Sequence, residues 1–433
     1  MKKAVLKLLM WLAKMILRKY HPTIVAVTGS VGKTATRRAI TVALGKRFRV
    51  YTSPENYNNE FGVPFSIMGV EAPGRSIWSW FRIFARALHI SVILDDIYPN
   101  VLVLEYGVDH PGDMEYLCRM ARPDVSVLTA ISHVHVANFE SFDELVAEKG
   151  DILEQTKPEG LAVLNADDDR VRTLAPRAAA LIRTYGLMAT ADIRAENVKL
   201  FTREDFSFDP GEKFCEMRFD IVLDDARVPA KLVNMLGIGQ VSAALAAVAV
   251  GLQLNVPLSE LVAQLPDILP QPGRMHPLPG IKGALILDDT YNAAPASMRA
   301  ALDVLREFSP MESARRIAVL GKMAELGPYS EEQHREIGKK AASIADILVT
   351  VGEEARDIRR GAIEAGMTEE KMQHFNTPVE AGRFLDREIK KGDIVAVKGS
   401  QSARMEKVVK DVMAQPERSE ELLVRQYGKW QKT

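Results

Sequence analysis

Short apolar runs alternate with helical patterns along most of the chain. The first run, Thr23–Val27, is followed by a glycine-containing loop and by a helical pattern that begins near Lys33. Runs of this length, rich in branched side chains, are typical of strands buried on both faces of a parallel sheet with helical connections. We therefore predict an α/β fold with a parallel sheet. The next expected strands are Val101–Leu104, Val125–Leu128 and Leu161–Leu164.

The alternation is interrupted once and then begins again. Residues 190–235 carry strand patterns separated by turn residues, which predicts an antiparallel insertion. The stretch Leu265–Gly280 is rich in proline and predicts a linker. Beyond it the pattern predicts a second, smaller α/β domain. Its expected strands are Ala284–Leu287, Ile317–Leu320, Ile347–Val351 and Ile394–Val397. The expected domains are an N-terminal helix at 1–20, a central domain at 21–271 and a C-terminal domain at 272–433.

The composition narrows the class of protein. The 433 residues include 56 lysines and arginines against 57 acids, so the net charge is −1 and no global basic field predicts binding to nucleic acid. The hydrophobic fraction of 47% and the charged fraction of 26% exclude a disordered chain and a multi-span membrane protein. Two cysteines, Cys118 and Cys215, cannot form a disulfide framework or a four-cysteine zinc site, which favours a reducing cytoplasm.

The first 20 residues are basic and amphipathic, with six cations and no acid. Four of the cations fall on one stripe of a helix, namely Lys3, Lys7, Lys14 and Arg18. The longest apolar run is Leu8–Ala13, far shorter than the ~20 residues that cross a bilayer. Two interpretations remain open: a helix that lies on an anionic membrane, and a helix that packs on the body of the protein.

A second unusual segment, Arg75–Ile97, carries two tryptophans and two phenylalanines beside several cations. Tryptophan is common at membrane interfaces, but it is also common in protein interiors and at ligand pockets. We predict that this segment contributes to the core or to a substrate pocket, with a membrane interface as the alternative.

A glycine loop follows the first predicted strand, in the sequence Ile24-Val-Ala-Val-Thr-Gly-Ser-Val-Gly-Lys-Thr34. Its two glycines allow the backbone to wrap closely around phosphate groups, and the N-terminus of the following helix favours an anion. The lysine supplies a positive charge for β- and γ-phosphates, and the threonine hydroxyl suits Mg²⁺. We therefore predict a nucleotide site. Its loop residues are Gly29, Ser30, Val31, Gly32, Lys33 and Thr34.

This short loop resembles that of the Mur ligase family, which uses ATP to form peptide bonds in peptidoglycan precursors. Further segments resemble motifs of the family in the same order along the chain, and the last three are most similar to MurF-type members. The segments are Asn56-Tyr-Asn-Asn-Glu-Phe-Gly-Val-Pro64, Leu104-Glu-Tyr-Gly107, Ser132-His-Val-His135, Glu148-Lys-Gly-Asp-Ile152, Asn165-Ala-Asp-Asp168, Pro272-Gly-Arg274, Asp288-Asp-Thr-Tyr-Asn-Ala-Ala-Pro295, Leu320-Gly-Lys-Met-Ala-Glu-Leu-Gly327 and Lys398-Gly-Ser-Gln-Ser-Ala-Arg-Met-Glu406.

The chain also differs from MurF-type members. These carry an N-terminal domain that holds the UDP-sugar precursor, and here we expect that domain to be absent, because only a short segment precedes the first strand. Ala130, Ala294 and Gln401 stand where the family usually has Asn, Asn and Arg. We expect these differences to affect the identity of the substrate more than the ATP chemistry.

The resemblance implies catalytic roles for Lys33, His135 and Lys149. Lys33 would hold the γ-phosphate, and Thr34 with Glu105 would bind one Mg²⁺. His135 would help to hold a second Mg²⁺, and Lys149 would carry a carbamate that also binds Mg²⁺. A carbamate forms only on a neutral amine, so the pKa of Lys149 must be lowered.

Each of these roles has a structural alternative. Glu105 could be a solvated acid at the end of a strand, and Lys149 could be a surface lysine in an acidic helix. His135 could be a hydrogen-bonded loop histidine, and His133 is an equal candidate on chemistry alone; only the resemblance selects His135.

The resemblance also implies ATP contacts from the C-terminal domain. Asn292 would contact the adenine, Asp289 the ribose and Arg274 a phosphate. If ATP is held between two domains, closure should complete the site and exclude water. Further residues match the family in roles that stay open, namely Lys398, Ser400 and His334.

The expected function is that of a monomeric, ATP-dependent carboxylate–amine ligase that forms an acyl-phosphate and adds D-Ala-D-Ala to a muramyl peptide. The expected location is the cytoplasm, with peripheral contact to the inner face of the membrane through residues 1–20. The alternatives are a Mur-like ligase with a different, membrane-presented acceptor, a P-loop ATPase coupled to a membrane partner, and a non-catalytic nucleotide-binding scaffold.

Overall fold

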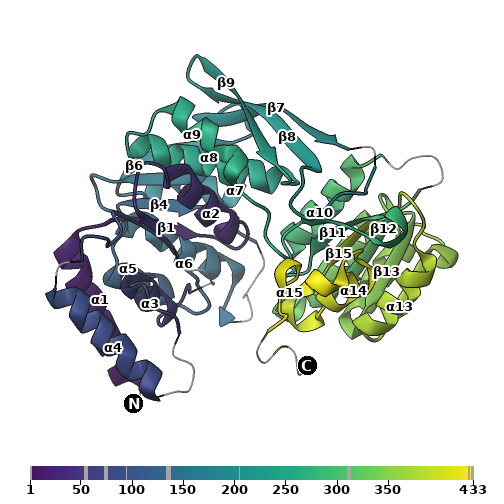
Figure 1. Ribbon diagram of the computed structural model, residues 1–433, viewed down its shortest axis with the longest axis horizontal. Coiled ribbons are helices and arrows are strands. Elements are labelled where there is room, and N and C mark those ends of the chain that lie inside the picture. Colours follow the sequence, from purple (N-terminus) through teal and green to yellow (C-terminus); the bar gives the residue numbers. More distant parts are fainter. Residues whose placement is uncertain are drawn as a thin grey trace.

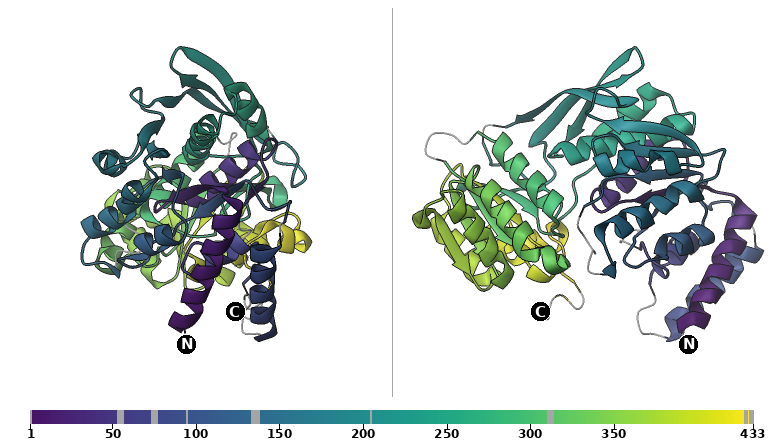
Figure 2. Two further views of the ribbon diagram at one scale, coloured as in Figure 1. Left: turned by 90° about the vertical axis from the view of Figure 1, so that its left-hand side faces the viewer. Right: turned by 180° about the vertical axis from the view of Figure 1, so that it is seen from behind.

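The computed structural model describes residues 2–52, 57–72, 77–93, 95–132, 138–203, 205–309, 314–427 and 430. These residues form two bodies that lie side by side, each built on its own sheet (Figure 1). Helices cover both sheets, so the predicted α/β fold is confirmed. Figure 2 shows the same two bodies from the side and from behind.

The first sheet consists of β1 (Thr23–Thr28), β2 (Val50–Tyr51), β3 (Val101–Glu105), β4 (Val125–Leu128), β5 (Leu161–Asn165), β6 (Leu181–Gly186), β7 (Ile193–Thr202), β8 (Cys215–Leu223) and β9 (Ala226–Val233). The strand order is β2-β3-β1-β4-β5-β6-β7-β8-β9. Neighbours from β2 to β7 are parallel, whereas β7, β8 and β9 pair antiparallel, as predicted for the insertion. Because β1 lies between β3 and β4, the carboxyl ends of these three strands meet at one edge, where open α/β sheets bind ligands.

The helices of the first body are α1 (Lys2–Tyr20), α2 (Lys33–Leu44), α3 (Gly62–Met68), α4 (Ile77–Val92), α5 (Asp113–Met120), α6 (Phe142–Gln155), α7 (Asp169–Thr173), α8 (Ile238–Gln253) and α9 (Leu258–Gln264). Successive side chains of a strand point to opposite faces, and β1 follows this rule. Val25 and Val27 pack in one core with α2, α8 and α9. Ile24 and Ala26 pack in a second core with α1 and α3 to α6.

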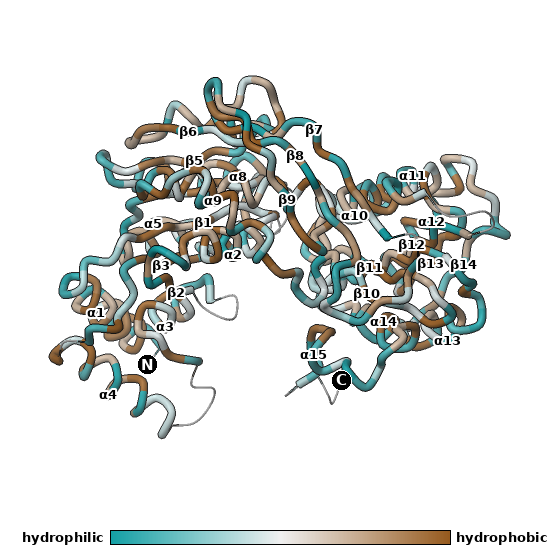
Figure 3. The backbone as a smooth tube through the Cα atoms, turned by 45° about the horizontal axis from the view of Figure 1, so that its top comes forward, coloured by the Kyte–Doolittle hydropathy of each residue, from teal (hydrophilic) through white to brown (hydrophobic). Residues whose placement is uncertain are grey.

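The second sheet consists of β10 (His276–Pro279), β11 (Leu285–Asp289), β12 (Arg316–Gly321), β13 (Ile347–Val351), β14 (Met372–Phe375) and β15 (Ile394–Lys398), in the order β10-β11-β15-β12-β13-β14. Its helices are α10 (Pro295–Glu307), α11 (Ser330–Ala342), α12 (Arg356–Glu364), α13 (Pro378–Glu388), α14 (Glu406–Val412) and α15 (Ser419–Leu422). Figure 3 shows hydrophobic residues along the central strands of this sheet. All four predicted strands are present.

The prediction of a linker at Leu265–Gly280 is partly wrong. It contains a short 3-10 helix, Leu265–Asp267, and the whole of β10, which pairs antiparallel with β11. Pro277 and Pro279 fit there because β10 lies at the edge of the sheet, where a missing N–H donor leaves no ladder bond unmade. Proline content alone could not distinguish an edge strand from a linker.

Helix α1 packs on the body of the protein, side by side with α4 (Figure 1). Leu9, Leu12, Ala13 and Ile16 are buried. The Lys19 ammonium donates hydrogen bonds to the carbonyl oxygens of Ile90 and Ile93, at 2.9 and 2.6 Å, and so ties the end of α1 to the end of α4. The inner face of α1 is therefore structural, and only its outer face can meet another surface.

The tryptophan-rich segment divides between the core and the surface. Trp80 and Phe84 stack and pack against the core, as predicted. Trp78 and Phe81 do not, because their side chains are 73% and 65% exposed. Among the described residues, no helix combines the length and the apolar character needed to cross a bilayer.

Candidate active site

The glycine loop lies between the end of β1 and α2, pressed against the residues that follow β4. Gly29 and Gly32 have φ values of 140° and 91°, a region that favours glycine. A Cβ on Gly29 would lie 2.1 Å from the hydroxyl oxygen of Thr129, so no other residue fits without a shift. The Ser30 N–H donates to the carbonyl oxygen of Ala130 at 2.6 Å. The loop is thus held in shape at the N-terminus of α2, where an anion is favoured.

Lys33 and Thr34 are the first two residues of α2 and point to the predicted site. The Lys33 ammonium donates to the carbonyl oxygen of Gly29 at 2.7 Å. Burial lowers the pKa of Lys33, and the opposing effect of Glu105 is the next largest. The Thr34 hydroxyl donates to the Glu105 carboxylate at 3.1 Å. Glu105 ends β3 and is buried, so the alternative of a solvated strand-end acid is wrong.

The buried Glu105 carboxylate has a cationic neighbour that sequence reasoning missed. Arg37 is also buried, and its Nε lies 3.6 Å from Glu105 Oε2. It stands one helical turn after Lys33 on α2, so the spacing could have placed it on the same face. Its Nη1 also donates to the Thr52 hydroxyl at 2.8 Å. A buried carboxylate needs such a partner, and here it has an arginine and a hydroxyl.

Lys149 lies on α6 and is 1% exposed, which excludes the surface lysine of the alternative interpretation. Burial lowers its pKa to about 7, and the positive charge of Lys33 is the next largest cause. Its neighbour Glu148 accepts hydrogen bonds from the backbone N–H groups of Gly112 and Met114, at 3.0 and 2.8 Å. This contact fixes the position of α6 against the start of α5. Lys149 is therefore buried, and with a pKa of about 7 roughly half of its amine is neutral at pH 7.

Oxygen donors for Mg²⁺ are present where the sequence predicts them. Thr34 and Glu105 offer a hydroxyl and a carboxylate in contact with each other, and both suit a hard cation. Among the described residues, no group of three or more His, Cys, Asp and Glu side chains could hold a metal ion. Of the predicted metal ligands, Glu105 is the only His, Cys, Asp or Glu residue that lies within the described part of the chain. His135 lies in the stretch 133–137, outside the described residues.

The C-terminal domain reaches the phosphate loop through Arg274. The guanidinium donates to the Thr34 hydroxyl at 3.1 Å and lies 4.1 Å from the centre of the Tyr291 ring, which orients it. Asp289 ends β11, and its carboxylate is 2.6 Å from the Lys398 ammonium. Lys398 also donates to the carbonyl oxygen of Asn292 at 2.8 Å. The predicted residues of this domain thus form a connected group, with Arg274 as the part that touches the first body.

Two further predicted residues have structural contacts. The Ser400 hydroxyl accepts from the Ala324 N–H at 2.7 Å. His334 is fully buried on α11, and its Nε2 accepts from the Met323 N–H at 2.9 Å. Burial lowers the pKa of His334, which favours the neutral ring that this acceptor role requires. Both side chains therefore hold the segment Leu320–Gly327 in place.

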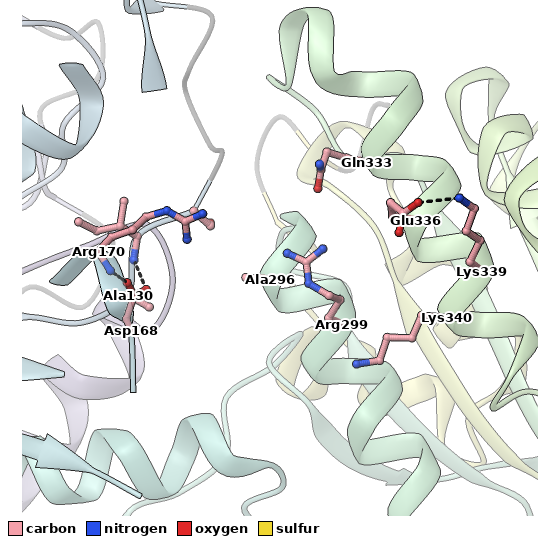
Figure 4. A pocket seen from close by; sticks show the side chains of 11 residues that line it. Ala130, Asp168, Arg170, Ala296, Arg299, Gln333, Glu336, Lys339 and Lys340 are labelled. Atoms are coloured by element: carbon pink, nitrogen blue, oxygen red, sulfur yellow. Dashed lines mark hydrogen bonds and ion pairs between the residues drawn. The ribbon is translucent and has the colours of Figure 1, made fainter. Parts of the chain in front are cut away.

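A cleft of about 630 Å³ separates the two bodies beside this group (Figure 4). One wall carries Asp168 and Arg170, which follow β5, and the other carries Arg299 of α10 and Lys340 of α11. Arg170 points into the cleft toward the helix that carries Arg299 (Figure 4). Asp168 accepts a hydrogen bond from the Ile131 N–H at 2.9 Å, which connects the ends of β4 and β5. The charged residues of its lining are four cations and two acids, and this excess of positive charge suits an anionic ligand.

Two family profiles match the chain. The Mur ligase middle domain matches residues 89–251, and the Mur ligase glutamate ligase domain matches residues 273–401. This chain belongs to the Mur ligase family. The similarity to curated relatives covers most of it. The UDP-N-acetylmuramoyl-tripeptide–D-alanyl-D-alanine ligase of Mycobacterium leprae is 29% identical over 396 residues, 88% of this chain and 71% of the relative. The enzyme of the same name from Bacillus subtilis is 24% identical over 406 residues, 94% of this chain and 79% of the relative.

Solved structures show the same similarity. MurF from Thermotoga maritima, in complex with ADP, has a TM-score of 0.75 and is 26% identical, covering 94% of this Mur ligase and 83% of that chain. MurF from Acinetobacter baumannii has a TM-score of 0.75 and is 25% identical, covering 92% of this Mur ligase and 78% of that chain. The resemblance to the Mur ligase family is therefore confirmed, and its MurF-type members are among the similar proteins.

The fold of this Mur ligase brings several of the predicted motifs together. The Gly107 N–H donates to the carbonyl oxygen of Asn58 at 2.7 Å, so the motif that begins at Asn56 contacts the motif that ends at Gly107. The residues that sequence reasoning missed are Arg37 and the cationic wall residues of the cleft. Of these, Arg170 stands two residues after a quoted motif, whereas the lysines of α11 look like any solvated helix face in the sequence.

Proposed function

We propose that this Mur ligase couples the conversion of ATP to ADP to amide-bond formation between a muramyl tripeptide and D-alanyl-D-alanine. One observation carries the proposal: Arg274 of the second body donates a hydrogen bond to Thr34 at the phosphate loop of the first, and the Thr34 hydroxyl in turn donates to Glu105. A site shared in this way is built for a nucleotide between two domains. The names of the similar proteins supply the two other substrates.

The reaction proceeds in two balanced steps. A carboxylate oxygen of the peptide attacks the γ-phosphorus of ATP, and ADP leaves as the acyl-phosphate forms. The amine of the dipeptide then attacks the acyl carbon, loses a proton and expels inorganic phosphate. The first step joins two anions, so it depends on fixed cations and on exclusion of water.

The loop residues bind the phosphates of ATP in this proposal. The glycine loop and the N-terminus of α2 face the phosphates, and Lys33 stabilises the charge that develops on the γ-phosphate. Thr34 and Glu105 hold Mg²⁺, which supplies charge neutralisation of the phosphates when bound. Arg274 contacts a phosphate from the hinge. Asn292 contacts the adenine and Asp289 the ribose.

Lys149 acts as a carbamate in this proposal. The buried amine has a pKa of about 7, so roughly half of it is neutral at pH 7 and can add CO₂, which turns a cation into an anion. The anion relieves the repulsion between Lys149 and Lys33. It also provides oxygen ligands for a second Mg²⁺, for which His135 is the other proposed ligand.

The cationic cleft is the proposed meeting place of peptide and dipeptide. Arg170, Arg299 and Lys340 line it from both bodies. D-Alanyl-D-alanine carries a carboxylate at one end, and an arginine pair can orient it so that the amine faces the acyl-phosphate. Closure of the two bodies would bring the walls together and exclude water.

An assay of product and cosubstrates tests the proposal. The chain should release ADP and phosphate only when ATP, UDP-muramyl tripeptide and D-alanyl-D-alanine are all present, and mass spectrometry should show the pentapeptide product. If product formed with another amine or acceptor, the proposed ligase activity would stand, but the proposed substrates would be wrong. ATP hydrolysis with neither substrate, at an unchanged rate when both are added, would favour an ATPase coupled to another partner.

The proposed location is the cytoplasm, with peripheral contact to the inner face of the membrane. For residues 1–20, the support comes from the cations on the outer face of α1, since its inner face is buried. Each basic residue near an anionic surface contributes about 1 kcal/mol of attraction. We propose a monomeric enzyme, which would sediment as one chain.

A further inference from the structure

Helix α4 has two apolar faces, and only one of them is covered. Ile83, Ala87 and Ile90 are buried against the body of the protein. On the opposite side, spacings of three and four residues align a second set of apolar side chains. We call this set the α4 stripe; it consists of Trp78, Phe81, Ala85, Leu88 and Val92, all exposed.

The α4 stripe is large and aromatic. Trp78 is 73% exposed and Val92 70%, and Ile97 continues the surface beyond the helix at 78%. The rings of Trp78 and Phe81 meet edge to face, with centroids 6.4 Å apart, so the two aromatic groups form one projecting surface. Contiguous apolar surfaces of this kind mark interaction sites. An amphipathic helix with an aromatic outer face is typical of binding to a partner or to a lipid interface.

The positive charge around the α4 stripe indicates which kind of surface it binds. Neither α1 nor α4 contains an acidic residue. Both helices carry exposed cations, namely Lys3, Lys7, Arg18, Arg82 and Arg86. Arg86 is paired with Asp95 at 3.1 Å, whereas Lys2 is paired with Glu60 at 3.2 Å. Cations around exposed tryptophan and phenylalanine complement an anionic bilayer, where phosphates meet acyl chains.

We propose that the α4 stripe docks on an anionic phospholipid bilayer. The helix lies in the plane of the interface, Trp78 and Phe81 enter the boundary between headgroups and acyl chains, and Arg82 with the cations of α1 contacts the phosphates. This deepens the membrane contact of the proposed function, because it moves the apolar anchor from residues 1–20 to α4. The helix pair lies at the end of the molecule away from the C-terminal domain, so docking leaves the cleft open to solution (Figure 1).

Vesicle co-sedimentation of the full chain tests the inference. We expect binding to vesicles of phosphatidylglycerol and phosphatidylethanolamine, little binding to phosphatidylcholine, and weakening in 0.5 M salt, where charges are screened within a few ångströms (~4 Å). Trp78→Ser combined with Phe81→Ser should lower the partition coefficient on the order of tenfold or more, because both rings leave water on docking. Arg82→Glu should lower it about thirtyfold by losing one attraction and adding one repulsion.

Leu181→Ser is the matched control, because Leu181 is 76% exposed on β6, away from the stripe, and should bind as the parent does. The inference is overturned if the Trp78/Phe81 variant binds as tightly as the parent. It is also overturned if the parent sediments as a dimer that this variant converts to a monomer, since a second copy would then cover the stripe. Ligase activity on soluble substrates is measured in parallel without vesicles. If the parent protein lacks this activity, the proposed function is rejected, whereas the docking result is unaffected.

Discussion

The edge of the first sheet and the α1–α4 helix pair belong to the same body but are built in opposite ways. At the edge, polar groups are buried and partnered, as Glu105 is by Thr34 and Arg37. On the outer side of the helix pair, apolar groups are exposed. The first arrangement concentrates fixed charge in a place of low dielectric, which suits chemistry on phosphates. The second leaves apolar surface in water, which suits association.

The two regions also differ in how much their contacts stabilise the fold. A buried ion pair adds little to stability, because desolvation of the charges offsets their attraction. The charges at the sheet edge are thus better explained by function than by folding. The inner face of α1 is a conventional apolar contact, and its burial stabilises the fold directly.

The largest expected effect comes from the lysine of the phosphate loop. Lys33→Ala should reduce the rate of ADP formation on the order of 10²–10³, the usual loss for one electrostatic contact in a transition state. Lys46→Ala, which removes an exposed lysine just beyond the same helix, should be near the parent rate. Comparable turnover in both variants would remove the reason to treat the sheet edge as the catalytic region.

A second effect, also expected to be large, concerns the buried lysine of α6. Lys149→Ala should lose about a hundredfold in rate, as expected for one group that stabilises developing charge. A short carboxylic acid in the buffer should restore part of the activity, because the missing group is an anion. Lys149→Arg is the discriminating variant: it keeps the cation but cannot form a carbamate, so activity equal to the parent would contradict the carbamate.

The fold class and most of the loop geometry could be predicted from the sequence because they depend on local pattern. Alternating apolar runs specify buried strands, and a glycine at φ 91° next to Lys33 specifies a helix start that faces an anion. The edge strand β10 could not be predicted, since its prolines are equally compatible with a linker.

The burial of Lys149 and the cations on the walls of the cleft also could not be predicted from the sequence. Lys149 stands among acids on α6, a pattern that a solvated helix shares, and only the packing of α6 against α5 buries it. Arg170 and Arg299 are 129 residues apart in the sequence and line one cleft from two bodies. The division of the aromatic segment between Trp80 inside and Trp78 outside depends likewise on which side of α4 faces the core.

The pH dependence of the rate should be moderate and of one sign. Lys149 has a pKa of about 7, and only its neutral form adds CO₂. As pH falls below 7 the amine becomes protonated, so the rate should fall about tenfold by pH 6 relative to the plateau. Circular dichroism across the same range checks that the fold is intact. Removal of CO₂ from the buffer should deepen the loss and bicarbonate should reverse it; a rate that is flat from pH 6 to 8 would contradict the lowered pKa.

The smallest expected effect separates the two faces of α1. Ile16 is fully buried, so Ile16→Val should lower the free energy of unfolding by ~0.5–1.5 kcal/mol, the usual cost of one buried methylene. Leu8 lies on the same helix but is 42% exposed, and Leu8→Ala should change stability by less than about 0.5 kcal/mol. Urea denaturation of both variants measures the difference. If the two variants were equally stable, α1 would not be packed on the body as described, and its inner face would be available to a membrane. If only Ile16→Val is destabilised, and both bind anionic vesicles as the parent does, then α1 supports the fold and carries charge while the α4 stripe provides the apolar contact.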